Sequence, residues 1–364
     1  MLRRLVPALI ICSIALAVPR LSAAQVTPAQ GYTPPDDTQS RNFGVTIFYD
    51  YTFNQSPKTT DADGNSVSAN AFQVSRTYVN FTGNISHLLS FRITPDISRL
   101  SGSGGNLDGS YVVRLKYGFA QINLTTLPAG SWVRIGLQQT PVIDYLEGVY
   151  RYRFQGGTMP DRAGYLNSSD NGASVHVNFA RNYGELQGGV FNGEGYGKGE
   201  ANDQKAYQVR ATLRPFAAGA PVMRGLRVSG FYSADQYIKD GTRNRGLFDA
   251  TFEHTRFNAG ATYITASDQT SATANETDGT GYSIWLTPFF QKKGDGLEAL
   301  LRYDAVKPNK DVDQVRKITI IGVAYWFPHP GGGATSAIML DFDQQKFPGA
   351  ATQNKIALHG LVNF

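Results

Sequence analysis

Five cationic side chains fall in four successive segments that each alternate apolar and polar residues. They are Arg76, Arg92, Arg114, Lys116 and Arg134. Within each segment the cations lie on the more polar face, so pairing of neighbouring segments would gather all five on one surface. Guanidinium and ammonium groups gathered in this way attract anions. We call these five residues the basic wall.

Acidic residues are frequent on the corresponding face of later segments, where we also place Arg302 and Lys317. The acids are Asp249, Glu253, Glu298, Asp304, Asp341 and Asp343. Rows of opposite charge facing each other across a narrow aqueous gap would create a transverse field that selects polar solutes. For any single residue, a simpler interpretation is that the charge only keeps an interior wet. Five cations on four adjacent segments favour a function.

The sequence lacks the residue patterns of an enzyme. None of its five histidines has a metal-ligand spacing, and it contains no Gly-x-Ser-x-Gly elbow or phosphate loop. The glycine-rich stretch NGEGYGKG, residues 192–199, opens no helix and is interpreted as a loop. His176 near Ser174 is a weak candidate for a hydrolase. We therefore predict no enzymatic activity, no cofactor and no metal.

Residues 1–24 have the three parts of a secretory signal peptide: two arginines, a short apolar run and small residues at the end. Cys12 lies in this run, so the mature chain would contain no cysteine. Residues 25–41 are polar and contain proline, which is typical of a flexible periplasmic leader. Removing three signal-peptide arginines lowers the net charge from +5 to +2 (5 − 3). This small excess, on a secreted chain, argues against a nucleic-acid partner.

Residues 42–364 contain about sixteen segments with period-two alternation, the pattern of strands with one apolar face. Their predicted starts are near residues 43, 72, 88, 112, 131, 172, 184, 205, 225, 246, 256, 280, 296, 315, 334 and 354. Charged residues make up only 17% of the chain and aromatic residues 12%, which suits an all-β protein.

The connections between these segments alternate in length, with long polar stretches such as QSPKTTDADGNSVSAN followed by short ones such as GNIS. A transmembrane antiparallel β-barrel of the bacterial outer membrane has this asymmetry, because its periplasmic turns are short and its external loops long. The chain ends on a strand pattern at Phe364, which fits the aromatic girdle of such a barrel. A terminal phenylalanine of this kind resembles the signal read by the barrel-assembly machinery.

The third external connection, residues 139–171, is unusually long and rich in aromatic residues. We predict that it folds back into the barrel and narrows it, although an ordered external loop making subunit contacts is the alternative. The charged residues of this constriction loop are Asp144, Glu147, Arg151, Arg153, Asp161 and Arg162. A barrel of about sixteen strands is too wide for side chains to fill, so it should hold water and act as a channel.

Several stretches resemble the phosphate-selective porin (O and P type) family. The stretch SRTYVNFTGNISHLLSFRITPDIS is similar to a motif of that family, and GLQQTPVIDYLEGVYRYR, TMPDRAGYLNSSDNGASVHV and GGVFNGEGYG follow its order. The resemblance implies a sixteen-stranded, commonly trimeric porin with arginines along an anion path, here Arg76, Arg92 and Arg114. The chain lacks the lysine-rich vestibule of the phosphate-specific members.

We therefore predict an outer-membrane porin, a passive diffusion channel for small hydrophilic solutes with a mild preference for anions, phosphate among them. Its predicted partners are outer-membrane lipid, two further copies in a homotrimer, and the assembly machinery that reads Phe364. The alternative is an adhesion or structural barrel that acts through its external loops.

Overall fold

The computed structural model describes residues 33–102, 104–219, 222–330 and 332–364. The predicted signal peptide and the first part of the leader lie outside the described residues. Sixteen strands of the described part form one closed antiparallel sheet. They are β1 (Ser40–Ser56), β4 (Asn70–Asn84), β5 (Leu89–Arg99), β6 (Tyr111–Asn123), β7 (Trp132–Gln139), β8 (Ser169–Asn178), β9 (Gly184–Phe191), β10 (Ala206–Leu213), β11 (Leu226–Ala234), β13 (Gly241–Glu253), β14 (Phe257–Asp268), β15 (Thr277–Pro288), β16 (Gly296–Lys307), β17 (Arg316–Phe327), β18 (Thr335–Lys346) and β19 (Gln353–Asn363).

The remaining short elements lie in connections. They are β2 (Thr59–Thr60), β3 (Ser66–Val67), α1 (Ile143–Tyr150), α2 (Met159–Arg162), the 3₁₀ turns Ala180–Asn182 and Met223–Gly225, and β12 (Gln236–Ile238). The observed strand starts lie within five residues of the predicted ones, the largest difference being 246 against Gly241. Among the described residues, no helix has the length and apolar character needed to cross a membrane.

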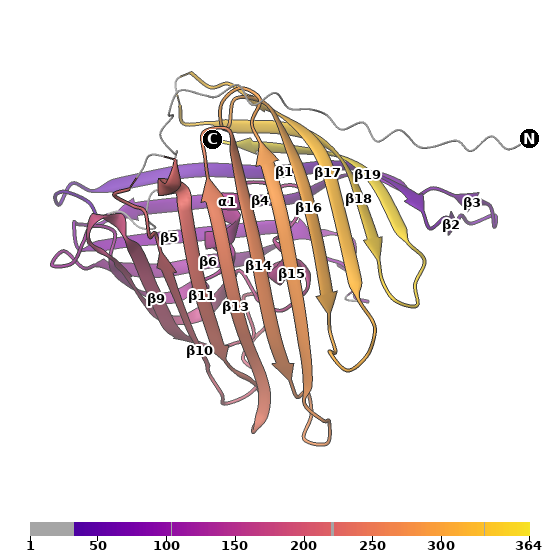
Figure 1. Ribbon diagram of the computed structural model, residues 1–364, viewed down its shortest axis with the longest axis horizontal. Helices are drawn as coiled ribbons and strands as arrows, with labels where there is room; N and C mark the ends of the chain where they lie inside the picture. Colours follow the sequence, from indigo (N-terminus) through magenta and orange to yellow (C-terminus); the bar gives the residue numbers. More distant parts are fainter. Residues whose placement is uncertain (1–32, 103, 220–221, 331) are drawn as a thin grey trace, which may run out of the picture.

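The sheet closes because β1 pairs with β4 on one side and with β19 on the other. At this seam the backbone of the terminal residue is paired. The Phe364 amide donates to the Val45 carbonyl (3.0 Å), and the Val45 amide donates to the Phe364 carbonyl (2.8 Å). On the inner side of the seam, His359 Nδ1 lies 2.5 Å from Asp50 Oδ1. Figure 1 shows the strands running side by side around the barrel, with the C-terminus at one rim. Closure leaves no unpaired sheet edge, as a membrane requires.

Side chains alternate between the two faces of the barrel wall as the sequence predicted. Large apolar residues are exposed on the outside, for example Val113, Ile135 and Leu340, which gives a surface suited to lipid. Polar and charged residues of the same strands point inward. The predicted all-β barrel with an aromatic, apolar exterior is confirmed.

Connections at the two rims differ as predicted. The rim that carries both β1's start and Phe364 has short turns such as residues 85–88 and 254–256, whereas the other rim carries the long loops. By the rule for outer-membrane barrels the first rim is periplasmic and the second external. The β2–β3 hairpin extends beyond the external rim (Figure 1).

The third loop, residues 140–168 between β7 and β8, folds into the barrel and packs against its inner wall. Its aromatic residues form a buried apolar cluster with Trp285 and Trp326 of the wall, where Tyr150 meets Trp285 at a ring-centroid distance of 5.4 Å. A second cluster joins the start of the loop to Phe231, Leu247 and Ile264. The loop therefore fills the half of the lumen that faces β11–β19, and the predicted infolding is confirmed.

A β-bulge interrupts the wall where the basic residues lie. Thr94 pairs with Tyr117 and Pro95 pairs with Leu115, which leaves Lys116 as the extra residue of β6. Pro95 has no amide hydrogen and cannot donate to the ladder, and prolines inside sheets are accordingly found at bulges. The bulge turns two consecutive side chains, Lys116 and Tyr117, into the barrel, where both are buried.

The third loop approaches the wall closely because Trp285 lies flat over a glycine. Gly260 of β14 pairs with Trp285 of β15, and a Cβ at Gly260 would lie 2.5 Å from the indole ring. We predict that Gly260→Ala displaces Trp285 and loosens its contact with Tyr150. The expected loss is about 1–3 kcal/mol of stability, the usual result of overpacking, measured as a lower unfolding temperature of the detergent-solubilised barrel. Gly230→Ala is the control, since nothing lies within 4 Å of its Cβ position; equal unfolding temperatures would contradict the prediction.

Candidate functional site

The five residues of the basic wall come from adjacent strands, β4 to β7, and they line the half of the lumen left free by the third loop. They fall into two groups. Arg76, Arg114 and Lys116 form an outer group toward the external rim, and Arg92 and Arg134 form an inner group toward the periplasmic rim. The two groups have different partners.

The outer arginines share one carboxylate. Asp96 Oδ2 lies 3.3 Å from Arg76 Nη1 and 3.1 Å from Arg114 Nε, and the Asp96 side chain is 0% exposed. Both arginines also donate to the hydroxyl of Tyr196, at 3.0 Å and 3.1 Å. Asp96 therefore compensates half of the charge of this pair.

Lys116 is enclosed by tyrosine rings. Its ammonium nitrogen lies 4.9 Å from the ring centre of Tyr78, 5.5 Å from that of Tyr117 and 5.6 Å from that of Tyr196, and it donates to the Tyr78 hydroxyl at 3.2 Å. Cation–π attraction offsets part of the cost of removing the charge from water. Only 3% of the surface of Lys116 is exposed, so its ammonium group is largely shielded from the lumen.

The inner arginines have only neutral hydrogen-bond partners. Arg92 donates to Thr94 and Asn80, while Arg134 donates to Gln121 Oε1 (2.7 Å) and Gln139 Oε1 (3.0 Å). Among the described residues neither arginine forms an ion pair. Aromatic rings support both guanidinium groups, with Arg92 4.4 Å from the ring centre of Tyr117 and Arg134 3.7 Å from that of Trp132. These two arginines are the guanidinium groups of the basic wall that no carboxylate of the described residues pairs with.

Arg92 and Arg134 line a cavity of about 640 Å³ at the periplasmic end of the lumen. Its other walls are mostly amide and hydroxyl side chains, together with Phe91 and Phe119. Residues 34–38 of the predicted leader close one side, and Asp37 fixes them to the turn at His87, whose amide donates to Asp37 Oδ1 at 3.0 Å. The described end of the leader thus lies against the barrel.

Four of the six predicted charges of the constriction loop face the basic wall. Asp144 accepts from the Tyr117 hydroxyl at 3.0 Å, a contact that lies between the outer and inner groups of cations. Arg153 Nε lies 2.9 Å from Glu147 Oε1, and its Nη2 lies 3.9 Å from Asp161. The side of the loop that faces the basic wall therefore carries three acids and one base.

The other two predicted residues, Arg151 and Arg162, point to the opposite wall and hold the loop in place. Arg151 and the Tyr152 hydroxyl both donate to Glu298, at 3.1 Å and 2.8 Å. Arg162 donates to Asp343 at 2.5 Å. Both acceptor carboxylates are buried. These arginines position the loop and do not face the basic wall.

The predicted acidic face points into the barrel, but it is not an open row of charge. Glu298 and Asp343 bind the third loop, Asp304 binds Arg302 at 2.6 Å, and Glu253 pairs with Arg227. A transverse field between two exposed walls therefore does not describe the lumen, because the third loop covers the acids. Lys317 also differs from the prediction: Asp304 pairs with Ile318, so Lys317 lies on the outer face of β17.

Sequence reasoning missed two residues of this site. Asp96 lies four residues after Arg92 on the same strand, so alternation places it on the same inward face. From the sequence, the Pro95–Asp96 pair was considered only as part of the family motif. Tyr196 lies in the glycine-rich stretch that was interpreted simply as a loop. It is the one aromatic residue between Asn192 and Lys205, and this could have indicated that the loop is anchored.

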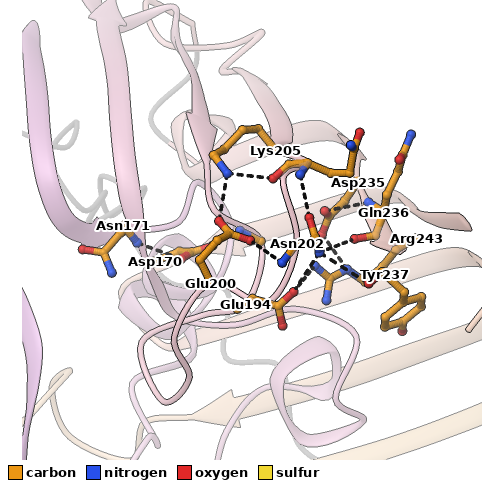
Figure 2. A network of polar contacts seen from close by, with 12 residues as sticks. Asp170, Asn171, Glu194, Glu200, Asn202, Lys205, Asp235, Gln236, Tyr237 and Arg243 are labelled. Carbon is orange, nitrogen blue, oxygen red and sulfur yellow. Dashed lines mark hydrogen bonds and ion pairs between the residues drawn. The ribbon is translucent and has the colours of Figure 1, made fainter. Parts of the chain in front are cut away.

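That fourth loop, residues 192–205, is fixed at its base by a polar network on the external side (Figure 2). Arg243 donates to Asp235 at 2.6 Å and lies 3.6 Å from Glu194, and the Gly193 amide donates to Asp170 at 2.6 Å. The described residues contain no group of histidine, cysteine and acidic side chains that could hold a metal ion.

No family model matches the chain, and no curated protein matches it in sequence. Solved structures do. A loop L8 deletion mutant of OmpT, an outer membrane protein of Vibrio cholerae, has a TM-score of 0.60 at 15% identity over 90% of this chain and 100% of that chain. An anion-selective porin from Comamonas acidovorans has a TM-score of 0.61 at 12% identity over 90% and 100%. The OmpF complex of Salmonella typhi with daunomycin gives 0.59 at 13% identity over 90% and 98%.

The chain has a porin fold. At these identities the likeness shows the architecture, a closed antiparallel barrel of the kind found in the bacterial outer membrane, as predicted. The narrower resemblance to the phosphate-selective porins stays a prediction, as do the roles of the individual site residues.

Glu147 should make the ion selectivity of the barrel depend on pH. Burial raises the pKa of its carboxyl to about 7, although Arg153 opposes this shift. The group is charged above that pH and neutral below it. Lowering the pH from about 8 to about 6 should therefore remove one negative charge opposite the basic wall and increase the preference for anions. The zero-current potential in a planar bilayer measures this, and Glu147→Gln should stay at the low-pH value. A pH step of the same size in Glu147→Gln would contradict the prediction.

Removing Glu298 should release the third loop from the wall. In Glu298→Ala, Arg151 and Tyr152 lose their shared buried acceptor, which we expect to cost about 3 kcal/mol, as for other broken buried pairs. Hydrogen–deuterium exchange of residues 143–154 should accelerate. Asp278→Ala breaks an exposed pair with Lys310 and serves as the control; equal exchange in both variants would show that Glu298 does not hold the loop.

Proposed function

We propose that this protein is a passive diffusion channel of the bacterial outer membrane, which passes small hydrophilic solutes with a mild preference for anions. The observation that carries the proposal is the inner pair of cations. Arg92 and Arg134 bond to neutral side chains and have no ion-pair partner among the described residues, and both line a cavity of about 640 Å³. A solute anion in this cavity would accept charge-assisted hydrogen bonds from these two arginines, because no carboxylate of the described residues pairs with them.

The matched structures support a channel over an enzyme or an adhesion barrel. They include, by their own descriptions, an anion-selective porin of Comamonas acidovorans and the outer membrane channel DcaP of Acinetobacter baumannii, the latter at 11% identity and a TM-score of 0.56. We propose inorganic phosphate as one of the anions, on the strength of the sequence resemblance. We also propose a homotrimer, a form described for OmpT of Vibrio cholerae.

The proposed anion path differs from the predicted one in where its charge lies. The prediction from the sequence assigned the preference for anions to all five cations of the basic wall: Arg76, Arg92, Arg114, Lys116 and Arg134. Asp96 compensates one of the two charges of the outer arginines, and tyrosine rings surround Lys116. The steady preference for anions should therefore come mainly from Arg92 and Arg134.

Arg92→Ala and Arg134→Ala test this directly. Each should lower the anion-to-cation permeability ratio by roughly two- to threefold, the combined effect on both ions of one unit charge at about 7 Å in water that is screened by about 0.1 M salt. The measurement is the zero-current potential of the refolded protein under a potassium chloride gradient. Arg224→Ala, an exposed residue of a periplasmic turn, should behave as the unmodified protein.

Other outcomes would revise the proposal in defined ways. A cation-selective potential would keep the channel and exclude the anion path. The absence of stepwise conductance from a correctly folded barrel would exclude the channel and leave the adhesion or structural alternative.

A further inference from the structure

The fourth loop carries a tyrosine that reaches all three outer cations. The Tyr196 hydroxyl accepts hydrogen bonds from Arg76 Nη1 (3.0 Å) and Arg114 Nη2 (3.1 Å), and it lies 3.3 Å from Asp96 Oδ2, to which it can donate. Its ring lies 4.7 Å from the Arg114 guanidinium and 5.6 Å from the Lys116 ammonium. The phenol oxygen thus occupies the point between two guanidinium groups where a solute oxyanion would bind.

The base of the same loop is attached to a different part of the barrel. Figure 2 shows Glu194 and Asp235 converging on Arg243 of β13, and Asp170 of β8 lies nearby. The Tyr196 amide donates to the Ser169 carbonyl at 3.0 Å. Tyr196 therefore extends from β8–β13 to the arginines of β4 and β6, from one part of the external lumen to another.

Two glycines set the direction of the tyrosine. Gly193 and Gly195 have φ values of 101° and 77°, which favour glycine. A Cβ at Gly195 would lie 2.6 Å from the Asn167 side chain, so a larger residue could not keep this path. The loop is thus built to present Tyr196 at a fixed place.

We propose that Tyr196 is a specificity-determining residue of the channel, a neutral cap that keeps solute anions away from Arg76, Arg114 and Lys116. The idea rests on the proposed channel function. With the hydroxyl in place, Tyr196 and Asp96 occupy Arg76 Nη1 and the Nε and Nη2 atoms of Arg114, and the ring lies beside Lys116. A solute anion at the outer arginines therefore has to compete with the tyrosine hydroxyl for their donors. Without the hydroxyl, the outer arginines regain two donors, and the anion path lengthens toward the external rim.

Tyr196→Phe removes the hydroxyl and keeps the ring. We expect the anion-to-cation permeability ratio to rise by about two- to tenfold, the range that corresponds to the net worth of one hydrogen bond. Block of the chloride current by added inorganic phosphate should strengthen in parallel. Tyr207→Phe, on the outer face of β10, is the matched control and should change neither quantity.

A second variant separates the hydroxyl from the position of the loop. Gly195→Val changes no charge but cannot adopt the native path, so it should move Tyr196 away and raise the ratio in the same direction. In an Arg114→Ala background, Tyr196→Phe should have a smaller effect, because one of the two arginines that it uncovers is gone. Folding of every variant is checked by its heat-modifiable migration in detergent gels.

The outcomes distinguish this inference from the proposed function. Suppose that the unmodified protein conducts, that Arg92→Ala lowers the anion-to-cation permeability ratio, and that Tyr196→Phe has the same ratio as Tyr207→Phe. The role of Tyr196 as a cap is then excluded, and the proposed channel function is retained. An effect of Tyr196→Phe that persists undiminished in Arg114→Ala would also exclude it. No conductance from the unmodified protein would exclude both proposals.

Discussion

The structure depends on the pairing of β1 with β19, which closes the sheet. In hydrocarbon an unpaired amide costs several kcal/mol, so a membrane sheet must have no edge. The closing pair extends to the last residue, where Phe364 and Val45 exchange two backbone hydrogen bonds. Once the sheet is closed by sixteen strands, its interior is wide and polar. The third loop and the basic wall both lie in that interior.

The third loop divides the lumen into a filled half and a free half. Its aromatic side chains pack against β11–β19, and Arg151, Tyr152 and Arg162 satisfy the buried carboxylates Glu298 and Asp343. A buried carboxylate without a partner is costly, so these acids and the loop arginines stabilise each other. The consequence for function is that the acidic face is covered. The free half is bordered by the basic wall and by the remaining charges of the loop.

Within the basic wall, a local interruption of the β-ladder helps to determine which partners each cation has. Pro95 interrupts the ladder, and the resulting bulge turns both Lys116 and Tyr117 inward. Tyr117 then supports Arg92 on one side and contacts Asp144 of the third loop through its hydroxyl. The outer cations bond to Asp96, Tyr78 and Tyr196, while the inner ones have only neutral hydrogen-bond partners. Five residues that look equivalent in the sequence thus become two groups with different accessible charge.

The sequence by itself determined the barrel, the strand positions within a few residues and the rim to which each loop belongs. It predicted the infolding of the third loop but left an ordered external loop open, which only the packing of the loop against the wall decided. Period-two alternation, loop lengths and aromatic content are local properties, so one chain records them directly. Only the tertiary structure decided which charges are compensated. Asp96, Tyr196 and Arg114 are far apart in sequence, and Lys317 shows that the register of a strand end determines the face on which a charge lies. The net charge at a site depends on contacts between distant segments. Alternation within one strand predicts the face on which a side chain lies, but it does not predict the ion-pair partner of that side chain.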